Sequence, residues 1–145
     1  MERMTKNGFT TLNPANGNEI KGYELMTQEE ADQAVKKCHE AFLKWRYKPI
    51  EERGKIIEKI GEVLQKRKRE FVELMTQEMG KLLKHGEQEI DLCSGICKYT
   101  AENGPKQLAD EERELPEGGN GIITHAPIGV IYGIQPWNFP AYQAV

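Results

Sequence analysis

The 145-residue sequence has no long hydrophobic run, and this absence excludes several classes of protein. No stretch approaches the roughly 20 consecutive apolar residues of a membrane span. Residues 1–10 contain Arg3 and Lys6 but no apolar run behind them, so they do not resemble a signal peptide. The formal net charge of −3 argues against a dedicated nucleic-acid binder. We therefore expect neither a membrane nor a nucleic acid as a partner.

Cysteine is also scarce, and its pattern suits neither disulfides nor metal. Three residues, Cys38, Cys93 and Cys97, are too few for a disulfide framework and predict a reducing, cytoplasmic location. Cys38 and the adjacent His39 diverge by about 100° on a helix, which excludes a nucleophile–base pair. Cys93 and Cys97 lack the second pair of ligands that a structural metal needs. We interpret all three as small buried apolar residues on helix faces and expect no metal.

Charge is nearly absent from the end of the chain. Of the 43 charged residues, one, Glu117, follows Leu115. The sequence is therefore a charged body followed by an apolar tail rich in glycine and proline. An apolar, strand-like tail needs a covering layer, and nothing in the sequence follows it. This pattern predicts a fragment of a longer protein or, as the alternative, a non-catalytic helical module whose tail pairs with a partner.

Apolar periodicity in the charged body predicts three helices. Thr27 and Glu30 have the spacing of a capping box at the start of the first helix. Its apolar face comprises Ala31, Ala34, Val35, Cys38, Phe42 and Trp45. The second helix is predicted over residues 50–79, with Gly80 as its C-terminal cap. The third is predicted over residues 82–102, where an Asn-Gly-Pro sequence is expected to end it.

The tail reads as the beginning of an α/β domain. Residues 105–120 form a polar connector, and residues 122–125 read as a strand. Residues 128–134 have no charge on either face, as in a parallel strand buried between helices. Residues 136–145 then read as a turn that enters a new helix. A two-sided strand followed by a helix favours the α/β class.

Two other patterns favour structural interpretations. The glycines of residues 118–121 match neither the P-loop nor the G-x-G-x-x-G pattern, so they are interpreted as a flexible connector. The basic run Lys66–Arg69 has several glutamates beside it, which favours an ion-paired, solvated helix surface over a nucleic-acid patch.

The stretch most suggestive of chemistry is Ile134-Gln135-Pro136-Trp137-Asn138-Phe139-Pro140. It follows the predicted buried strand, and ligands of open α/β sheets bind at the carboxyl ends of strands. The two prolines stiffen the turn. The side-chain amide of Asn138 could donate to an oxyanion, a contribution of about 3–4 kcal/mol in acyl transfer. A helix-capping Asn and a core Trp explain the same residues equally well.

A family resemblance separates these alternatives. Pro127-Ile128-Gly129-Val130, followed by the P-W-N-F-P sequence of residues 136–140, resembles the aldehyde dehydrogenase superfamily. The resemblance extends over nearly the whole chain, through Asn13-Pro14-Ala15-Asn16-Gly17, Trp45, Pro49, Arg53 and Glu78-Met79-Gly80-Lys81. Met79-Gly80-Lys81, Tyr99 and Asn103-Gly104-Pro105 are most similar to the bacterial succinate-semialdehyde dehydrogenase branch.

The resemblance implies a truncated α/β fold. Residues 1–117 would be the N-terminal helical part of a Rossmann-like cofactor-binding domain. Residues 118–127 would be an oligomerisation strand segment, and residues 128–145 the first core strand and the start of the following helix. The family's catalytic Cys and general-base Glu would lie beyond residue 145. The full-length protein would be a homo-oligomer, a dimer or tetramer.

The resemblance also implies a reaction and its residues. A Cys thiolate attacks the aldehyde, a hydride passes to NAD or NADP, and water hydrolyses the thioester, so that a semialdehyde becomes a carboxylic acid. Asn138 would donate to the oxyanion. Ile134, Gln135, Pro136 and Trp137 would line the cofactor site, although Gln135 departs from the aliphatic residue common there. Phe139 and Gln143 would line the substrate tunnel.

Overall fold

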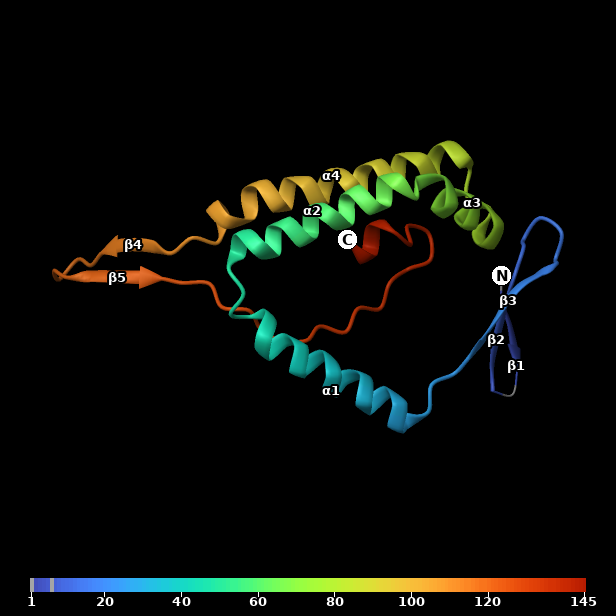
Figure 1. The fold of residues 1–145 in the computed structure, drawn as a ribbon, viewed down its shortest axis with the longest axis horizontal. Coiled ribbons are helices and arrows are strands. Elements are labelled where there is room, and N and C mark those ends of the chain that lie inside the picture. Colours follow the sequence, from blue (N-terminus) through green and yellow to red (C-terminus); the bar gives the residue numbers. More distant parts are fainter. Residues whose placement is uncertain (1, 6) are drawn as a thin grey trace.

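The computed structural model describes residues 2–5 and 7–145, whose elements follow one another from β1 to a short 3₁₀ helix, η1. The helices are α1 (Gln28–Trp45), α2 (Ile50–Lys66), α3 (Lys68–Met79), α4 (Leu83–Gln107) and η1 (Tyr142–Ala144). The strands are β1 (Glu2–Thr5), β2 (Gly8–Leu12), β3 (Glu19–Glu24), β4 (Glu111–Glu114) and β5 (Asn120–Ile123). Figure 1 shows α2 and α4 side by side, α1 apart from them, and the β4–β5 hairpin projecting at one end.

Helices α2, α3 and α4 form the helical body and enclose the core. The core consists of Leu64, Val72, Met75, Ile90, Cys93 and Cys97. Glycine lets the helices approach closely: a Cβ on Gly61 of α2 would lie 2.9 Å from the Cβ of Cys97. Within the part of the chain that the structure describes, none of the helices has the length and apolar composition to cross a bilayer.

Helix α1 begins as predicted, but its apolar face is at most half-buried. The Thr27 hydroxyl accepts a hydrogen bond from the Glu30 N–H, and the Glu30 carboxylate accepts one from the Thr27 N–H, which confirms the capping box. These bonds, led by the one from the Thr27 backbone, lower the pKa of Glu30. No residue of α1 is buried, because the rest of the described chain packs elsewhere. Cys38, expected to be buried, is exposed.

The predicted second helix is two helices, a correction to the sequence analysis. The helix breaks at Arg67, whose φ and ψ are −100° and 11°. The break turns α3 so that its Val72 and Met75 reach α4, where a Cβ on Gly86 would lie 3.2 Å from Val72 Cγ1. Sequence periodicity does not reveal the break, because the basic residues on both sides suit a helix. Gly80 ends α3 in the left-handed conformation, at φ 71°, as predicted.

The third predicted helix continues five residues farther than expected. Helix α4 passes through Asn103-Gly104-Pro105 and ends at Gln107. Pro105 has no N–H to donate to the Ala101 carbonyl within the last two turns of the helix. One turn earlier, the Asn103 side chain donates to the Tyr99 carbonyl at 2.9 Å. Close packing also supports this end, since a Cβ on Gly54 of α2 would lie 3.2 Å from the Ala101 carbonyl oxygen.

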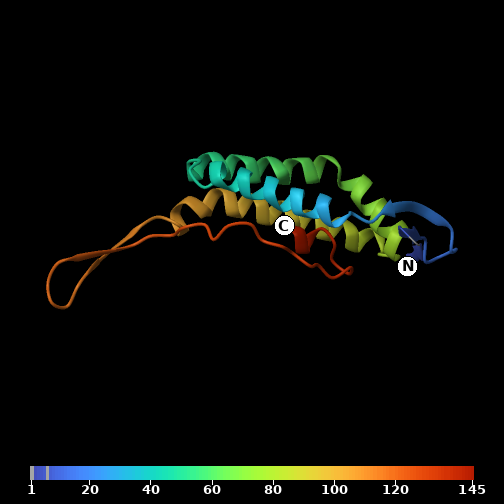
Figure 2. The same cartoon turned by 90° about the horizontal axis from the view of Figure 1, so that it is seen from below.

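The N-terminal strands form an antiparallel sheet in the order β1-β2-β3 at the α3 end of the helical body (Figures 1 and 2). The sheet is joined to that body by a side-chain bond. Thr11 of β2 donates its hydroxyl to Glu78 Oε1 of α3 at 3.2 Å. The sheet therefore has a fixed place against the helix that precedes Gly80.

The segment after α4 departs most from the sequence analysis. The predicted connector contains β4, which pairs antiparallel with β5, and β5 begins two residues before the predicted strand at 122–125. The predicted strand at 128–134 is absent: residues 124–136 have no regular secondary structure. Ile128, Tyr132 and Ile134 are 83–90% exposed. A parallel strand exists only beside another strand, and no other described segment lies there to pair with it.

Candidate active site

The P-W-N-F-P turn is held against the junction of α3 and α4. Figure 1 shows the C-terminal segment passing between α1 and the α2–α4 pair before it ends in η1. Lys81, in the loop between α3 and α4, donates from Nζ to the Asn138 carbonyl oxygen at 2.8 Å. The same ammonium lies 4.0 Å from the centroid of the Phe139 ring, a cation–π distance. One lysine therefore contacts two consecutive residues of the turn.

Glu89 of α4 completes this attachment. One oxygen of its carboxylate, Oε1, accepts from the N–H groups of Ala141 and Tyr142 at 2.9 and 3.0 Å. The other oxygen forms an ion pair with Lys81 Nζ. The side chains of Glu89 and Lys81 are 0% and 7% exposed. The charge of Glu89 is thus removed from water and fully compensated by an ammonium and two backbone amides.

The structure exposes the predicted site residues instead of enclosing them. Asn138 is exposed, and its side-chain amide has no hydrogen-bond partner among the described residues, so its N–H groups are available to a ligand. The predicted cofactor-contacting residues Ile134, Gln135, Pro136 and Trp137 are exposed as well. The ring of Phe139, a predicted tunnel residue, meets Tyr142 edge to face at 6.2 Å. Gln143 is exposed, and its backbone N–H donates to the Phe139 carbonyl at 3.1 Å.

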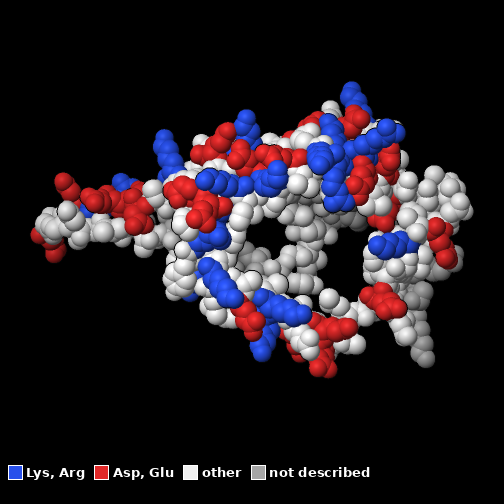
Figure 3. Space-filling view, viewed as in Figure 1, with Lys and Arg blue, Asp and Glu red and all other residues white. Residues whose placement is uncertain are grey.

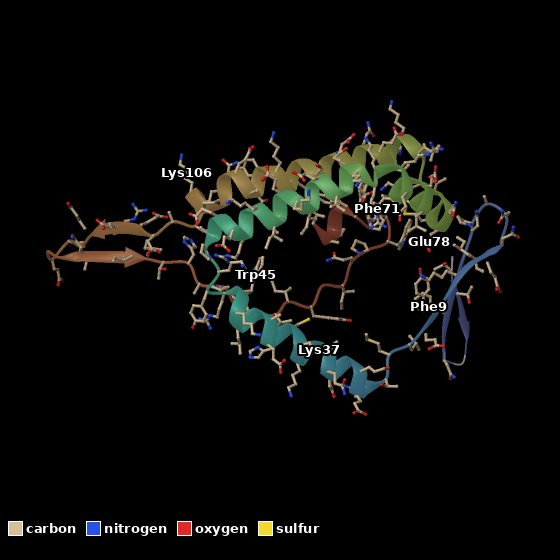
Figure 4. The ribbon with its side chains drawn as sticks, viewed as in Figure 1. Phe9, Lys37, Trp45, Phe71, Glu78 and Lys106 are labelled. Carbon is tan, nitrogen blue, oxygen red and sulfur yellow. The ribbon has the colours of Figure 1, made fainter. Side chains whose placement is uncertain are left out.

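Trp137 faces a cavity that the other predicted site residues do not line. The cavity has a volume of about 800 Å³ between the turn, α3 and the N-terminal sheet. Its walls include Trp137 and Pro140 of the turn, Phe71 and Glu78 of α3, and Thr11 of β2. Figure 4 shows Phe71 and Glu78 extending from α3 near the C-terminal loop. The structure therefore brings Asn138 and Phe139 to Lys81 and Glu89, while the exposed Trp137 lines one wall of a separate, mostly apolar cavity.

The thiols of the helical body are unsuited to catalysis. Burial is the main cause that raises the pKa of Cys93 to about 11, with the negative charge of Glu89 as the next cause. Burial also raises the pKa of Cys97. Both thiols are protonated at neutral pH, as expected of packing residues. Among residues 2–5 and 7–145, no group of three or more His, Cys, Asp or Glu side chains could hold a metal ion.

The outer surface of the helices is ion-paired, as the sequence predicts. Arg67 bonds to Glu70, Lys68 to Asp91 and Arg69 to Glu73. Figure 3 shows basic and acidic side chains intermixed along this face, with no extended area of one sign. The basic run therefore pairs with carboxylates, and no uniform basic surface for a polyanion results.

Lys81 and Glu89 are the site residues that the sequence analysis missed. Lys81 lies in the matched Gly80-Lys81 sequence, but nothing there assigned it a role. Glu89 had a detectable signal: it precedes Cys93 and Cys97 by four and eight residues, so it shares their helix face. A carboxylate in register with buried residues must be paired. That reasoning predicts a buried partner without naming Lys81.

Comparison with known proteins identifies the arrangement. The aldehyde dehydrogenase family profile matches residues 1–145. This chain belongs to the aldehyde dehydrogenase family. It is 35% identical over 137 residues to an NADP(+) succinate-semialdehyde dehydrogenase of Deinococcus radiodurans, which covers 94% of the chain and 28% of that relative. A probable enzyme of the same name from Synechocystis is 32% identical, covering 93% of the chain and 30% of the relative.

Solved aldehyde dehydrogenase structures confirm the fold class. The succinic semialdehyde dehydrogenase of Streptococcus pyogenes, in complex with NADP+, matches with a TM-score of 0.87 and 29% identity. The match covers 93% of this chain and 30% of that one. A betaine aldehyde dehydrogenase of Staphylococcus aureus, in complex with NAD+, matches with a TM-score of 0.86 and 28% identity over 99% of this chain and 29% of that one. The chain thus corresponds to the N-terminal part of the fold and spans about 30% of its relatives' length.

Proposed function

We propose that this chain is the N-terminal part of an NAD- or NADP-dependent aldehyde dehydrogenase that oxidises succinate semialdehyde to the acid. The observation that carries the proposal is the P-W-N-F-P turn, which presents an unpaired Asn138 amide on a backbone anchored to α4. The relatives named above support the substrate, and their names favour NADP. The catalytic Cys and Glu are proposed to lie outside these 145 residues.

In this proposal the chain contributes binding and orientation. The amide of Asn138 donates to the aldehyde oxygen as negative charge develops on it, which stabilises the transition state. A bound NAD or NADP would supply the acceptor for the hydride that leaves the substrate carbon. Phe139 and Gln143 are proposed to border the substrate path.

The exposed residues of the tail fit such a cofactor. Ile134 and Trp137 present apolar surface on a proline-stiffened segment, and Pro136 and Gln135 lie between them. An uncovered apolar face of this kind suits the nicotinamide-ribose side of a dinucleotide. We propose these four residues as its contacts. Two properties remain proposals of the same kind: a cytoplasmic location, and assembly into a dimer or tetramer through the segment 118–127, whose β5 has an open edge.

The proposal is tested with the whole protein that contains this sequence. We expect reduced nicotinamide to form from succinate semialdehyde, and Asn138→Ala to lower kcat by about 10²–10³. Asn18→Ala, which changes another exposed asparagine, should leave kcat unchanged. The 145 residues alone should form no product. An unchanged kcat for Asn138→Ala would contradict the role of this residue, and an inactive whole protein would favour the helical-module alternative.

A further inference from the structure

We propose that Lys81 and Glu89 act together as a positioning clamp that holds the Asn138 turn in place for catalysis. The catalytic half of this inference rests on the proposed function of Asn138; the structural half stands on the contacts alone. Nothing in the P-W-N-F-P sequence itself closes the turn onto the helical body. The clamp does so from residues 57 and 52 positions away from their partners in the turn.

The clamp contacts four residues of the turn. Lys81 binds the carbonyl of Asn138 and the face of Phe139, and Glu89 binds the N–H groups of Ala141 and Tyr142. These contacts lie immediately on both sides of Pro140, which has no N–H of its own. The bond to its carbonyl fixes the backbone position of Asn138. Its side-chain amide can then take only the few directions that the staggered side-chain rotamers allow.

Contacts within the helical body hold both residues of the clamp in place. The Thr76 hydroxyl donates to the Lys81 carbonyl at 2.8 Å, and Gly80 fixes the turn before it. Glu89 lies on the buried face of α4, with Gly86 before it and Cys93 after it, and directly precedes the fully buried Ile90. A buried ion pair adds little net stability compared with apolar residues of the same volume. The pair is therefore better explained by the position that it gives the turn than by the stability of the helices.

This argument defines a variant that separates position from folding. Lys81→Met together with Glu89→Leu replaces both buried charges with apolar side chains, so neither is left unpaired. The helical body should fold, as measured by its helical circular dichroism, while the turn loses its attachments. The matched control is Lys59→Met with Glu62→Leu, which removes an exposed ion pair within α2.

Two readouts test the clamp. Backbone hydrogen exchange at Ala141 and Tyr142 should become at least tenfold faster in the double variant and stay unchanged in the control. In the active whole protein, kcat should fall about tenfold or more with little change in KM, because misorientation of a catalytic group affects the chemical step. Wild-type exchange at Ala141 and Tyr142 in the double variant would overturn the clamp.

A third measurement needs no variant. In the wild-type chain the amides of Ala141 and Tyr142 should exchange more slowly than those of Ile131 and Tyr132, which lie in the uncovered tail. Equal exchange rates would overturn the proposal even if the double variant fails to fold. Failure of the proposed function is distinguishable: Asn138→Ala would then leave kcat unchanged while the exchange differences persist.

Discussion

The helical body and residues 124–136, the uncovered tail, contain similar apolar side chains in very different surroundings. In the body, Ile90 is 0% exposed and lies in a core shared by three helices. In the uncovered tail, Ile128 is 90% exposed and has no strand beside it. Helices satisfy their own backbone hydrogen bonds, whereas a strand depends on its neighbours. The body therefore forms within this chain, and the predicted core strand does not.

The turn that follows the uncovered tail is intermediate between the two regions in how much it contacts the rest of the chain. Within residues 138–142, Ala141 packs against the core, and the charged pair Lys81 and Glu89 holds the backbone beside it. The comparison indicates that hydrogen bonds and ion pairs to the helical body, as well as apolar burial, determine which segments of this chain are held in place. Three measurements examine this difference, beginning with the largest expected effect.

The alkylation rate of the exposed Cys38 should exceed the rates of the buried Cys93 and Cys97 by more than a hundredfold. Cys38, on the uncovered α1, should react quickly with a soluble alkylating reagent at pH 8. Cys93 is fully buried, and its pKa of about 11 leaves about one thiolate in a thousand at that pH. Mass spectrometry of the time course should show one fast thiol, and Cys93 and Cys97 reacting only on unfolding. Rapid reaction of all three thiols would show that the core of the helical body is accessible to the reagent.

Removing apolar side chains should distinguish the two regions in stability. Ile90→Ala should lower the free energy of unfolding by about 2–5 kcal/mol, because it leaves a cavity in the core. Ile128→Ala should change it by less than about 0.5 kcal/mol, since its side chain is exposed. Urea unfolding followed by circular dichroism measures both. A large effect of Ile128→Ala would show that residues 124–136 are covered, contrary to the comparison above.

The helices were largely predictable from sequence, because local patterns determine where they begin and end. The capping box at Thr27 and the left-handed Gly80 are set by the residues themselves, and both are confirmed. The predictions of one unbroken helix over residues 50–79 and of a helix end at residue 102 were wrong, because the helix breaks at Arg67 and α4 continues through Pro105. Both depend on how α3 and the end of α4 pack against distant residues, which no local signal contains.

The site was predictable only in part, for a related reason. A motif identifies Asn138 and its neighbours, but the contacts that hold them come from Lys81 and Glu89, more than 45 residues earlier. The strand at 128–134 was predicted from its uncharged, apolar composition and from the family resemblance. Composition indicates that a segment can form a strand when a neighbouring strand is present. Neither of the two described sheets, β1-β2-β3 and β4-β5, provides such a neighbour.

The smallest expected effect concerns two glycines of the helical body. A Cβ on Gly61 would lie 2.9 Å from the Cβ of Cys97 and 3.2 Å from the carbonyl oxygen of Ser94, so Gly61→Ala should cost about 1–3 kcal/mol. Gly95, on α4, would have nothing within 4 Å of its Cβ. Gly95→Ala should therefore stabilise the protein by up to about 1 kcal/mol through helix propensity.

These two substitutions add the same methyl group to neighbouring helices, so their difference isolates the α2–α4 contact. Thermal unfolding of both variants beside the wild type measures it. Opposite shifts in Tm would show that the helical body owes its cohesion to close backbone approach at Gly61. If Gly61→Ala instead raised Tm as Gly95→Ala does, α2 and α4 could not be in the contact described. Helices α2 and α4 would then resemble α1, which has no buried residue.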